Sequence, residues 1–468
     1  MVPKALTIDL LLIGAIFILG VFQTRVILRS MSYLEILSLS FPVGLGTLTW
    51  LLFILSWLGL HISIITITIL YTVLLICLIL IRRFFRRPHT KHRYTTELSS
   101  ILKEHSQILS IIPWVLLILL FLSAIFISVG RAYSTWDAMA VWSVKGYGIA
   151  LEGTIFAGRT WGSHGLNYPL NLPLAISIFK LLSDDVLPGS KLIFPLLFIS
   201  LIVNIYSFFI RRNISQTHAK FGLLLLASVP LLFEHATLGY ANLAFTMYIV
   251  LGALYAMEGI YGNHPDELVM SGLLLGFAAW TRQEGLFISL LVVMALSLTW
   301  LISRKGKLKF VPWLLPLVSI SMVWFIFTHI YGTEGQITLA LREALPGISQ
   351  GNFHLESIYT ILRYAARQML EPSIWGLLFP ICLLLIILAG PRRFSPKENI
   401  YLFGGGATTL AIGIAVFFYY YAVSFREMPL DWWLSTSFNR MILPVGVLLG
   451  ILAVMAIGSS TLLSNDHE

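Results

Sequence analysis

Long uncharged apolar runs recur along this 468-residue chain, and they constrain its fold more than any other feature. Residues 109–129 and 241–256, for example, contain no Asp, Glu, Lys or Arg. About 20 apolar residues are enough to cross the bilayer core as a helix. Only 11% of the residues are charged, whereas a soluble domain carries roughly 25%. The chain is therefore predicted to be an all-α polytopic integral membrane protein.

The apolar runs predict about 13 transmembrane helices within one transmembrane domain, residues 1–468, and no separate soluble domain. The first run is followed, rather than preceded, by Arg25 and Arg29 and lacks a small-residue cleavage site, so we expect a retained span and no signal peptide. The run 268–281 is short, and its glycines suggest a broken helix. The expected spans are 6–23, 37–58, 61–81, 108–129, 191–210, 219–233, 241–260, 268–281, 285–303, 311–330, 373–390, 400–421 and 441–458.

Five basic clusters fall on the same side of the membrane when the chain is threaded through these spans. They are Arg25/Arg29, residues 82–93, Arg211/Arg212, residues 304–309 and Arg392/Arg393/Lys397. Cytoplasmic loops carry an excess of Lys and Arg, so this side and the C-terminus are predicted to be cytoplasmic. The net charge of +9 is thereby explained by loops facing anionic membrane lipids, and it does not suggest nucleic acid.

Three long segments, 130–190, 331–372 and 422–440, then face the outside and hold most of the unusual polar residues. In a bacterium this is the extracytoplasmic face of the inner membrane. Residues 138–150 are predicted to form a short interfacial helix, because Trp and Tyr favour the membrane surface. Residues 170–182 are too few to span comfortably, and we expect a membrane-embedded or re-entrant helix there.

Asp137 is the first candidate for chemistry, since it is a lone carboxylate shortly after a predicted span. A carboxylate at the membrane surface can act as a general base, an effect of roughly 10²–10⁴ in rate. The alternative is that Asp137 caps the helix beginning at Ala138, a position that Asp favours. The spacing alone leaves both interpretations open.

Arg440 begins the last predicted span on the outer face, against the positive-inside bias, and a guanidinium there can grip a phosphate through two bonds. The alternative is an arginine that contacts lipid headgroups.

Arg282 and Glu284 lie at the outer junction of two spans, where ionisable residues are functional candidates. Being two residues apart, they do not share a helix face, so we expect each to have another partner. A structural ion pair in the bundle is the alternative.

Glu234 ends another predicted span on the outer side and is a candidate second acid, whereas His235 is expected to be an interfacial side chain. No HxxxH, CxxC or DxD spacing supports a metal site, and Asp184/Asp185 is expected to be an acidic turn. Cys77 and Cys382 both lie in apolar runs, so no disulfide framework is expected. Nucleotide-binding and serine-hydrolase motifs are missing from the sequence.

Five short motifs carry a resemblance to a known family. They are residues 136–145 (WDAMAVWSVK), 167–174 (NYPLNLPL), 240–244 (YANLA), 281–285 (TRQEG) and 435–440 (STSFNR). In their order and common face, the chain resembles the GT-C superfamily of polytopic membrane glycosyltransferases. It looks most like the bacterial branch related to protein O-mannosyltransferases and lipid A aminoarabinose transferases.

The resemblance implies an extracytoplasmic active site, a polyprenyl-phosphate-linked sugar as donor, and inversion at the anomeric carbon. It implies Asp137 as the base. The positions matched to its remaining contacts are Arg440, Arg282 and Lys145 for the donor phosphate, and Trp136, His164, Tyr168, Glu234, Tyr240 and Glu284 for sugar or acceptor. Relatives often have Asp where this chain has Asn242. No cofactor is expected, although some relatives need a divalent ion, and the acceptor is a lipid, a glycan or a protein.

Two other functions fit parts of the sequence. A transporter or flippase of lipid-linked sugars would also need a lipid groove and buried arginines, and it would show inverted repeats and broken helices. No repeat is visible, and the polar residues cluster on one face, which favours surface chemistry. A glycan ligase or polymerase would use residues such as Arg342, His354, Arg363 and Arg367 in the segment 331–372.

Overall fold

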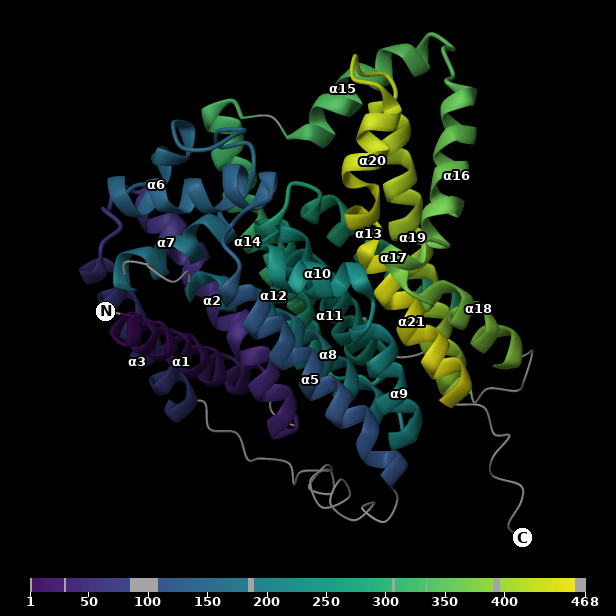
Figure 1. Cartoon of the computed structure of the whole chain (residues 1–468), viewed down its shortest axis with the longest axis horizontal. Coiled ribbons are helices and arrows are strands. Elements are labelled where there is room, and N and C mark those ends of the chain that lie inside the picture. Colours follow the sequence, from purple (N-terminus) through teal and green to yellow (C-terminus); the bar gives the residue numbers. More distant parts are fainter. Residues whose placement is uncertain are drawn as a thin grey trace.

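The computed structural model describes residues 2–28, 31–84, 108–183, 189–304, 308–333, 335–389 and 396–458, and within these ranges every regular element is a helix (Figure 1). The elements are α1 (Val2–Ile27), α2 (Tyr33–Trp57), α3 (Ile64–Phe84), α5 (Ile108–Gly130), η1 (Asp137–Ser143), α6 (Val144–Glu152), η2 (Ile155–Arg159), α7 (Asn171–Ser183), η3 (Gly189–Leu192), α8 (Ile193–Arg211), α9 (Gln216–Ala227), α10 (Pro230–Leu238), α11 (Ala241–Tyr261), α12 (Pro265–Thr281), α13 (Gly285–Ser303), α14 (Phe310–Tyr331), α15 (Gln336–Ser349), α16 (Leu355–Met369), α17 (Pro372–Trp375), α18 (Leu378–Ala389), α19 (Pro396–Val423), α20 (Leu430–Met441) and α21 (Leu443–Gly458).

Among these residues, nine helices are long and apolar enough to cross a membrane, or up to 11 if two bent pairs are each one span. The prediction of an all-helical, multi-pass membrane protein is therefore confirmed, whereas the number 13 stays a prediction. The helices at 268–281 and 373–390 are shorter than a standard span: α12 has 17 residues and α18 has 12.

The expected span 219–233 is wrong as a single helix, because α9 and α10 meet at an angle of 62°. The chain leaves the helical conformation at Val229, and Pro230 then starts α10, where a missing N–H is harmless. The last span is similarly preceded by α20, which bends by 41° into α21 next to Pro444. Proline cannot continue the hydrogen-bond ladder of a preceding helix, and this accounts for both breaks.

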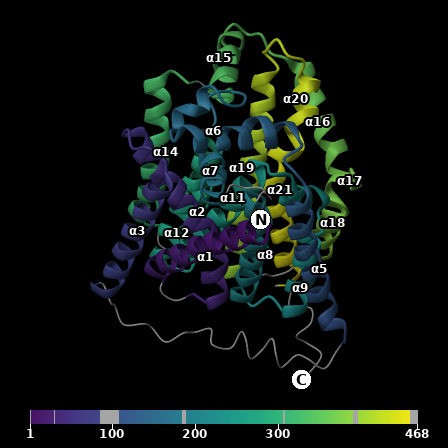
Figure 2. The ribbon, with the colours of Figure 1, turned by 60° about the vertical axis from the view of Figure 1, so that its left-hand side comes forward.

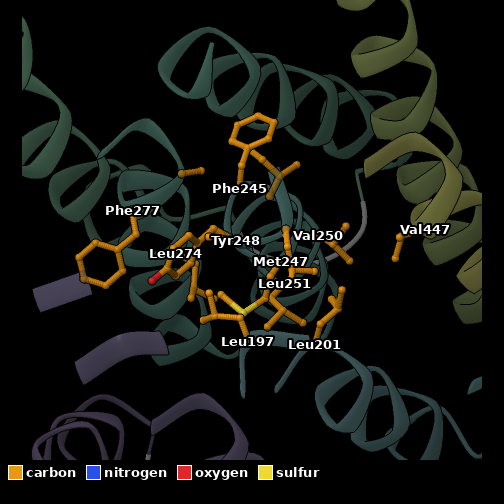
Figure 3. Close-up of a cluster of buried hydrophobic side chains, with 14 of the residues drawn as sticks. Leu197, Leu201, Phe245, Met247, Tyr248, Val250, Leu251, Leu274, Phe277 and Val447 are labelled. Carbon is orange, nitrogen blue, oxygen red and sulfur yellow. The ribbon is translucent and has the colours of Figure 1, made fainter. Parts of the chain in front are cut away.

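Helix α11 is the centre of the bundle, and its apolar window is completely buried. Figure 3 shows Met247, Tyr248 and Leu251 of α11 facing Leu197 of α8 and Leu274 of α12. A helix that is apolar on all sides is expected in such a central position.

The expectation of a break in 268–281 is also wrong, because α12 is continuous. Its glycines allow close packing: a Cβ at Gly272 would lie 2.0 Å from the carbonyl oxygen of Trp313 in α14. A Cβ at Gly276 would likewise crowd Ile320 of α14. Small residues let two helix backbones approach closely in membrane bundles.

The cluster Arg211/Arg212 differs from the basic loop facing anionic lipids that we expected, because Arg211 is buried inside the bundle. Arg211 forms buried salt bridges to Glu35 at 3.2 Å and Glu267 at 3.0 Å, and Arg212 pairs with Glu258 at 2.9 Å. These two arginines act as counter-charges that connect α2, α8, α11 and α12. Other expected basic positions, including Arg29, residues 85–93 and Arg392/Arg393, lie outside the described residues, as do Asp184 and Asp185.

Helices α6, α15, α16 and α20 gather at one end of the bundle, away from the turn between α8 and α9 (Figures 1 and 2). The segment 138–150 is helical, in η1 and α6, and 170–182 forms α7, which packs against α6. The candidate site lies at this end, where the loops after α5, α10 and α12 meet the lower end of α20.

Candidate active site

Asp137 and Arg440 meet as an ion pair in which Nη1 of the guanidinium donates to Oδ2 of the carboxylate. Asp137 lies in the first turn of the π-helix η1, and Arg440 lies in the last turn of α20. The capping interpretation of Asp137 is wrong, since η1 starts after Trp136 without a side-chain cap. Both side chains are half-buried, with exposed fractions of 25% for Asp137 and 20% for Arg440.

An aromatic ring supports Arg440 from another side. The guanidinium carbon lies 5.5 Å from the centre of the Tyr240 ring, a distance typical of cation–π contacts. Tyr240 follows Gly239, whose φ of 97° belongs to the left-handed region and whose missing Cβ leaves room for Tyr133. The Tyr240 ring in turn contacts His235, with centroids 5.4 Å apart. The loop after α10 thus places a ring face beside the ion pair.

Arg282 and Glu284 form a two-bond fork behind this pair. Nε and Nη2 of Arg282 each donate to a different oxygen of Glu284 at 3.1 Å, and both residues are buried. The two residues pair with each other, against the expectation from their spacing, because the i,i+2 argument holds only inside a helix. Arg282 ends α12 in an extended conformation (φ −142°, ψ 153°), which lets the two side chains converge. Arg282 also has the further partner that we expected, Asn242.

Asn242 links this fork to Arg440. Its Oδ1 accepts from Nη1 of Arg282 at 3.1 Å, and its Nδ2 reaches the backbone oxygen of Arg440 at 3.5 Å. An amide can accept and donate at once, whereas an ionised carboxylate can only accept. Asn242 can therefore bridge Arg282 and the backbone of Arg440, which an ionised Asp at this position could not do.

The pKa values of Glu284 and Tyr168 are shifted in opposite directions in this region. Burial would raise the pKa of Glu284, but Arg282 outweighs it and holds this pKa below its usual value. Burial, together with the charge of Glu284, raises the pKa of Tyr168 to about 12. The charges of Asp137 and Arg440 also act on the pKa of Tyr168, the first raising it and the second lowering it.

The first outer segment holds the other expected contacts. The Tyr168 ring lies 5.6 Å from Trp142 and 5.5 Å from His164. Burial and the charge of Lys145 lower the pKa of His164, while Asp137 raises it. Trp136 and His164 are exposed beside the site.

Lys145 and Glu234 were both expected in the site, and among the described residues neither forms an ion pair or a hydrogen bond with Asp137, Arg440 or the fork. Lys145 is fully buried, donates to the backbone oxygen of Gly165 at 2.6 Å, and has its pKa lowered to about 8 by burial. It supports the loop and presents no ammonium at the surface. Glu234 is exposed in α10, and among the described residues its carboxylate bonds to nothing in the site.

Gln283 ties the outer segments together and was not among the expected residues. Its Nε2 donates to the backbone oxygen of Asn167 at 2.5 Å, and its Oε1 accepts from the backbone N–H of Gln336 at 2.6 Å. The Gln336 side chain accepts from Arg426 at 2.6 Å. All three outer segments are thereby joined at a residue between Arg282 and Glu284. A polar residue inside the motif 281–285 was the only sequence signal for it.

An apolar groove opens next to the fork, with about 460 Å³ of empty space including its mouth. Glu284 and Met441 border the groove at the site, and the sulfur of Met441 lies 3.8 Å from Nη2 of Arg282. Phe287, Leu341 and Phe418 on its lining are exposed, as expected for an entrance from lipid. The remaining lining residues are Ile288, Ile337, Ala340, Ala415, Val416, Tyr419 and Ala422.

Within the described ranges, no three His, Cys, Asp or Glu side chains come together in a way that could hold a metal ion. The sequence matches no known family model, and no curated protein and no solved structure is detectably similar to it. The site must therefore be interpreted from its own geometry.

Proposed function

We propose that this protein is a membrane glycosyltransferase that moves a sugar from a polyprenyl-phosphate donor to an acceptor hydroxyl, on the extracytoplasmic face of a bacterial inner membrane. One observation carries the proposal: Asp137 pairs with Arg440, whose neighbour in the chain, Met441, lines an apolar groove. A base, a phosphate-binding cation and a lipid groove are the three elements that such a reaction needs.

In the proposed reaction, Asp137 removes the proton of the acceptor hydroxyl and is left as a carboxylic acid. The acceptor oxygen forms a bond to C1 of the sugar while the bond from C1 to the phosphate oxygen breaks. The electron pair of that bond goes to the lipid phosphate, whose charge Arg440 stabilises through N–H donors. A single displacement of this kind inverts the anomeric carbon.

The surrounding residues have supporting roles in this proposal. The Arg282–Glu284 fork and Asn242 hold the end of α20 and so position Arg440. Tyr240, Tyr168, His164 and Trp136 offer ring faces and polar tips to the sugar or acceptor. The groove between α13, α15 and α19 takes the first isoprene units of the donor.

The test is transfer of radiolabelled sugar from a panel of polyprenyl-phosphate donors by membranes that contain the protein. Wild type should label an acceptor, and Asp137→Asn should not. Asp431→Asn is the matched control, because Asp431 is an exposed carboxylate in the first turn of α20, whereas Arg440 lies in the last turn. Failure of the wild type with every donor, or equal transfer by both Asp variants, would contradict the proposal.

A transporter of lipid-linked sugars is the second candidate, and the bent helices favour it. The α9–α10 break of 62° precedes Tyr240, and the α20–α21 break of 41° follows Arg440. Discontinuous helices frame the substrate sites of many transporters. In proteoliposomes, movement of an intact labelled donor between leaflets, without cleavage of its sugar–phosphate bond, would favour this function over transfer.

A further inference from the structure

Among the described residues of the candidate site, Arg440 is the cation that is both partly exposed and paired through a single N–H group. The Arg282 side chain is only 9% exposed, and its Nε, Nη1 and Nη2 already donate to Glu284 and Asn242. Lys145 is completely buried under Gly165. Within the described part of the site, an arriving phosphate therefore has Arg440 as its accessible charged donor.

The present partner of Arg440 is the group proposed to act as the base. Nη1 of Arg440 donates to Oδ2 of Asp137, so this N–H is not available to a phosphate while the pair is formed. A forked grip on a phosphate needs two N–H groups of the guanidinium. Because Nε is buried and Nη1 already serves Asp137, a phosphate gains a forked grip on the closed pair by sharing Nη1 with Asp137 or drawing it away, so the two anions compete for this guanidinium.

A second observation indicates that the observed position of Arg440 leaves a donor unused. Nε of Arg440 is buried and has no hydrogen-bond partner among the described residues. A buried polar group without a partner is unfavourable, because it has lost its hydrogen bonds to water and gained none in return. The contact with the Tyr240 ring face is non-directional compared with a hydrogen bond, so it permits the guanidinium to shift toward an arriving anion.

We propose that Arg440 is a donor-operated latch on Asp137. In the empty protein the pair is closed, and a donor phosphate opens it by taking the guanidinium, which frees the carboxylate for the acceptor hydroxyl. The donor must then bind before the acceptor can be deprotonated, and departure of the lipid phosphate closes the latch again. This inference rests on the proposed function, because it assigns the order of events at that same site.

The test is binding of farnesyl phosphate, a polyprenyl monophosphate without a sugar, to the full-length protein in nanodiscs. If Asp137 competes for Arg440, Asp137→Asn should bind this probe about tenfold more tightly than wild type. Asp431→Asn is the matched control, because it removes an exposed carboxylate in the first turn of α20, the helix that ends at Arg440 and Met441. The control should leave binding unchanged, since Asp431 does not pair with Arg440.

A double-mutant cycle separates competition from simple charge repulsion. In an Arg440→Ala background, Asp137→Asn should give no gain in affinity, because no shared guanidinium is left. Arg440→Lys serves as the background if the alanine variant does not fold, and there the gain should shrink. A gain that is equally large with and without Arg440, or no gain in the single variant, would overturn the latch while leaving the transferase proposal in place. Absence of binding by wild type and Asp137→Asn alike would contradict both proposals.

Discussion

Arg282 and Glu284, only two residues apart, bind each other through two hydrogen bonds of 3.1 Å in the buried turn between α12 and α13. The turn makes this possible, since Arg282 leaves the helix in an extended conformation. Through Asn242 the same guanidinium is connected to the backbone of Arg440. The fork therefore supports the candidate site structurally. The N–H donors of Arg282 are already bonded to Glu284 and Asn242.

Glu284→Gln should destabilise the protein strongly, because it leaves the buried charge of Arg282 without a counter-charge. Breaking one partner of a buried pair typically costs about 3–5 kcal/mol. Thermal unfolding of the detergent-purified protein should show a much lower midpoint. The control is Glu343→Gln, which breaks the more exposed pair with Arg426 and should cost about 1 kcal/mol or less. If both variants lost the same amount of stability, the Arg282–Glu284 pair would not be a main support of the fold.

Gln283→Ala should release the segment at Gln336 from the first outer segment, because it removes both hydrogen bonds that join them. Hydrogen–deuterium exchange should rise in α15, and transfer should slow because the site is less well held. Gln23→Ala is suited as a control, since it removes a comparable pair of bonds to Thr47 in the bundle. Unchanged exchange in α15 after loss of Gln283 would refute this tie.

Ala415→Phe should fill part of the apolar groove and raise the KM for long-chain donors. A farnesyl-phosphate donor should be affected less, because fewer isoprene units have to fit. Leu410→Phe, on the same helix but at an exposed position outside the groove, should leave both KM values unchanged. If Ala415→Phe had no effect on long-chain donors, the lipid would have to lie elsewhere.

Lys145 should make stability depend on pH. Burial lowers its pKa to about 8 from the 10.5 of a lysine in water. Between these values the unfolded chain binds more protons than the folded one, so stability should rise with pH, by at most about 1.4 kcal/mol per unit. Relative to Lys145→Met, wild type should gain stability from pH 8 to pH 10. A constant difference between the two proteins would show that the amine is well solvated.

The sequence was sufficient to predict the class of fold, because apolar length and low charge are properties of each segment by itself. The positions of Asp137, Arg440 and Arg282 near predicted span ends also predict them as candidates, and the resemblance adds Tyr240. Their partners were not predictable in the same way: 303 residues separate Asp137 from Arg440, and only the packed bundle brings them together.

The errors have local physical causes. The apolar pattern predicts one continuous helix over 219–233, but Pro230 begins a new helix that runs in a different direction from the preceding one. The glycines of α12 were interpreted as a break, whereas they accommodate α14. The i,i+2 rule predicts that Arg282 and Glu284 do not pair, but this rule applies to helices and not to the turn in which they lie. Gln283 is not predicted as a site residue, because a neutral side chain carries no charge signal.

The measurement that tests the central claim most directly is the initial rate of sugar transfer by wild type and Asp137→Asn in nanodiscs, at a saturating concentration of a donor that both proteins bind. If Asp137 is the base, the variant should be slower by roughly 10²–10⁴, with donor binding retained or tightened. Transfer at the wild-type rate by a variant that binds the donor would contradict the account.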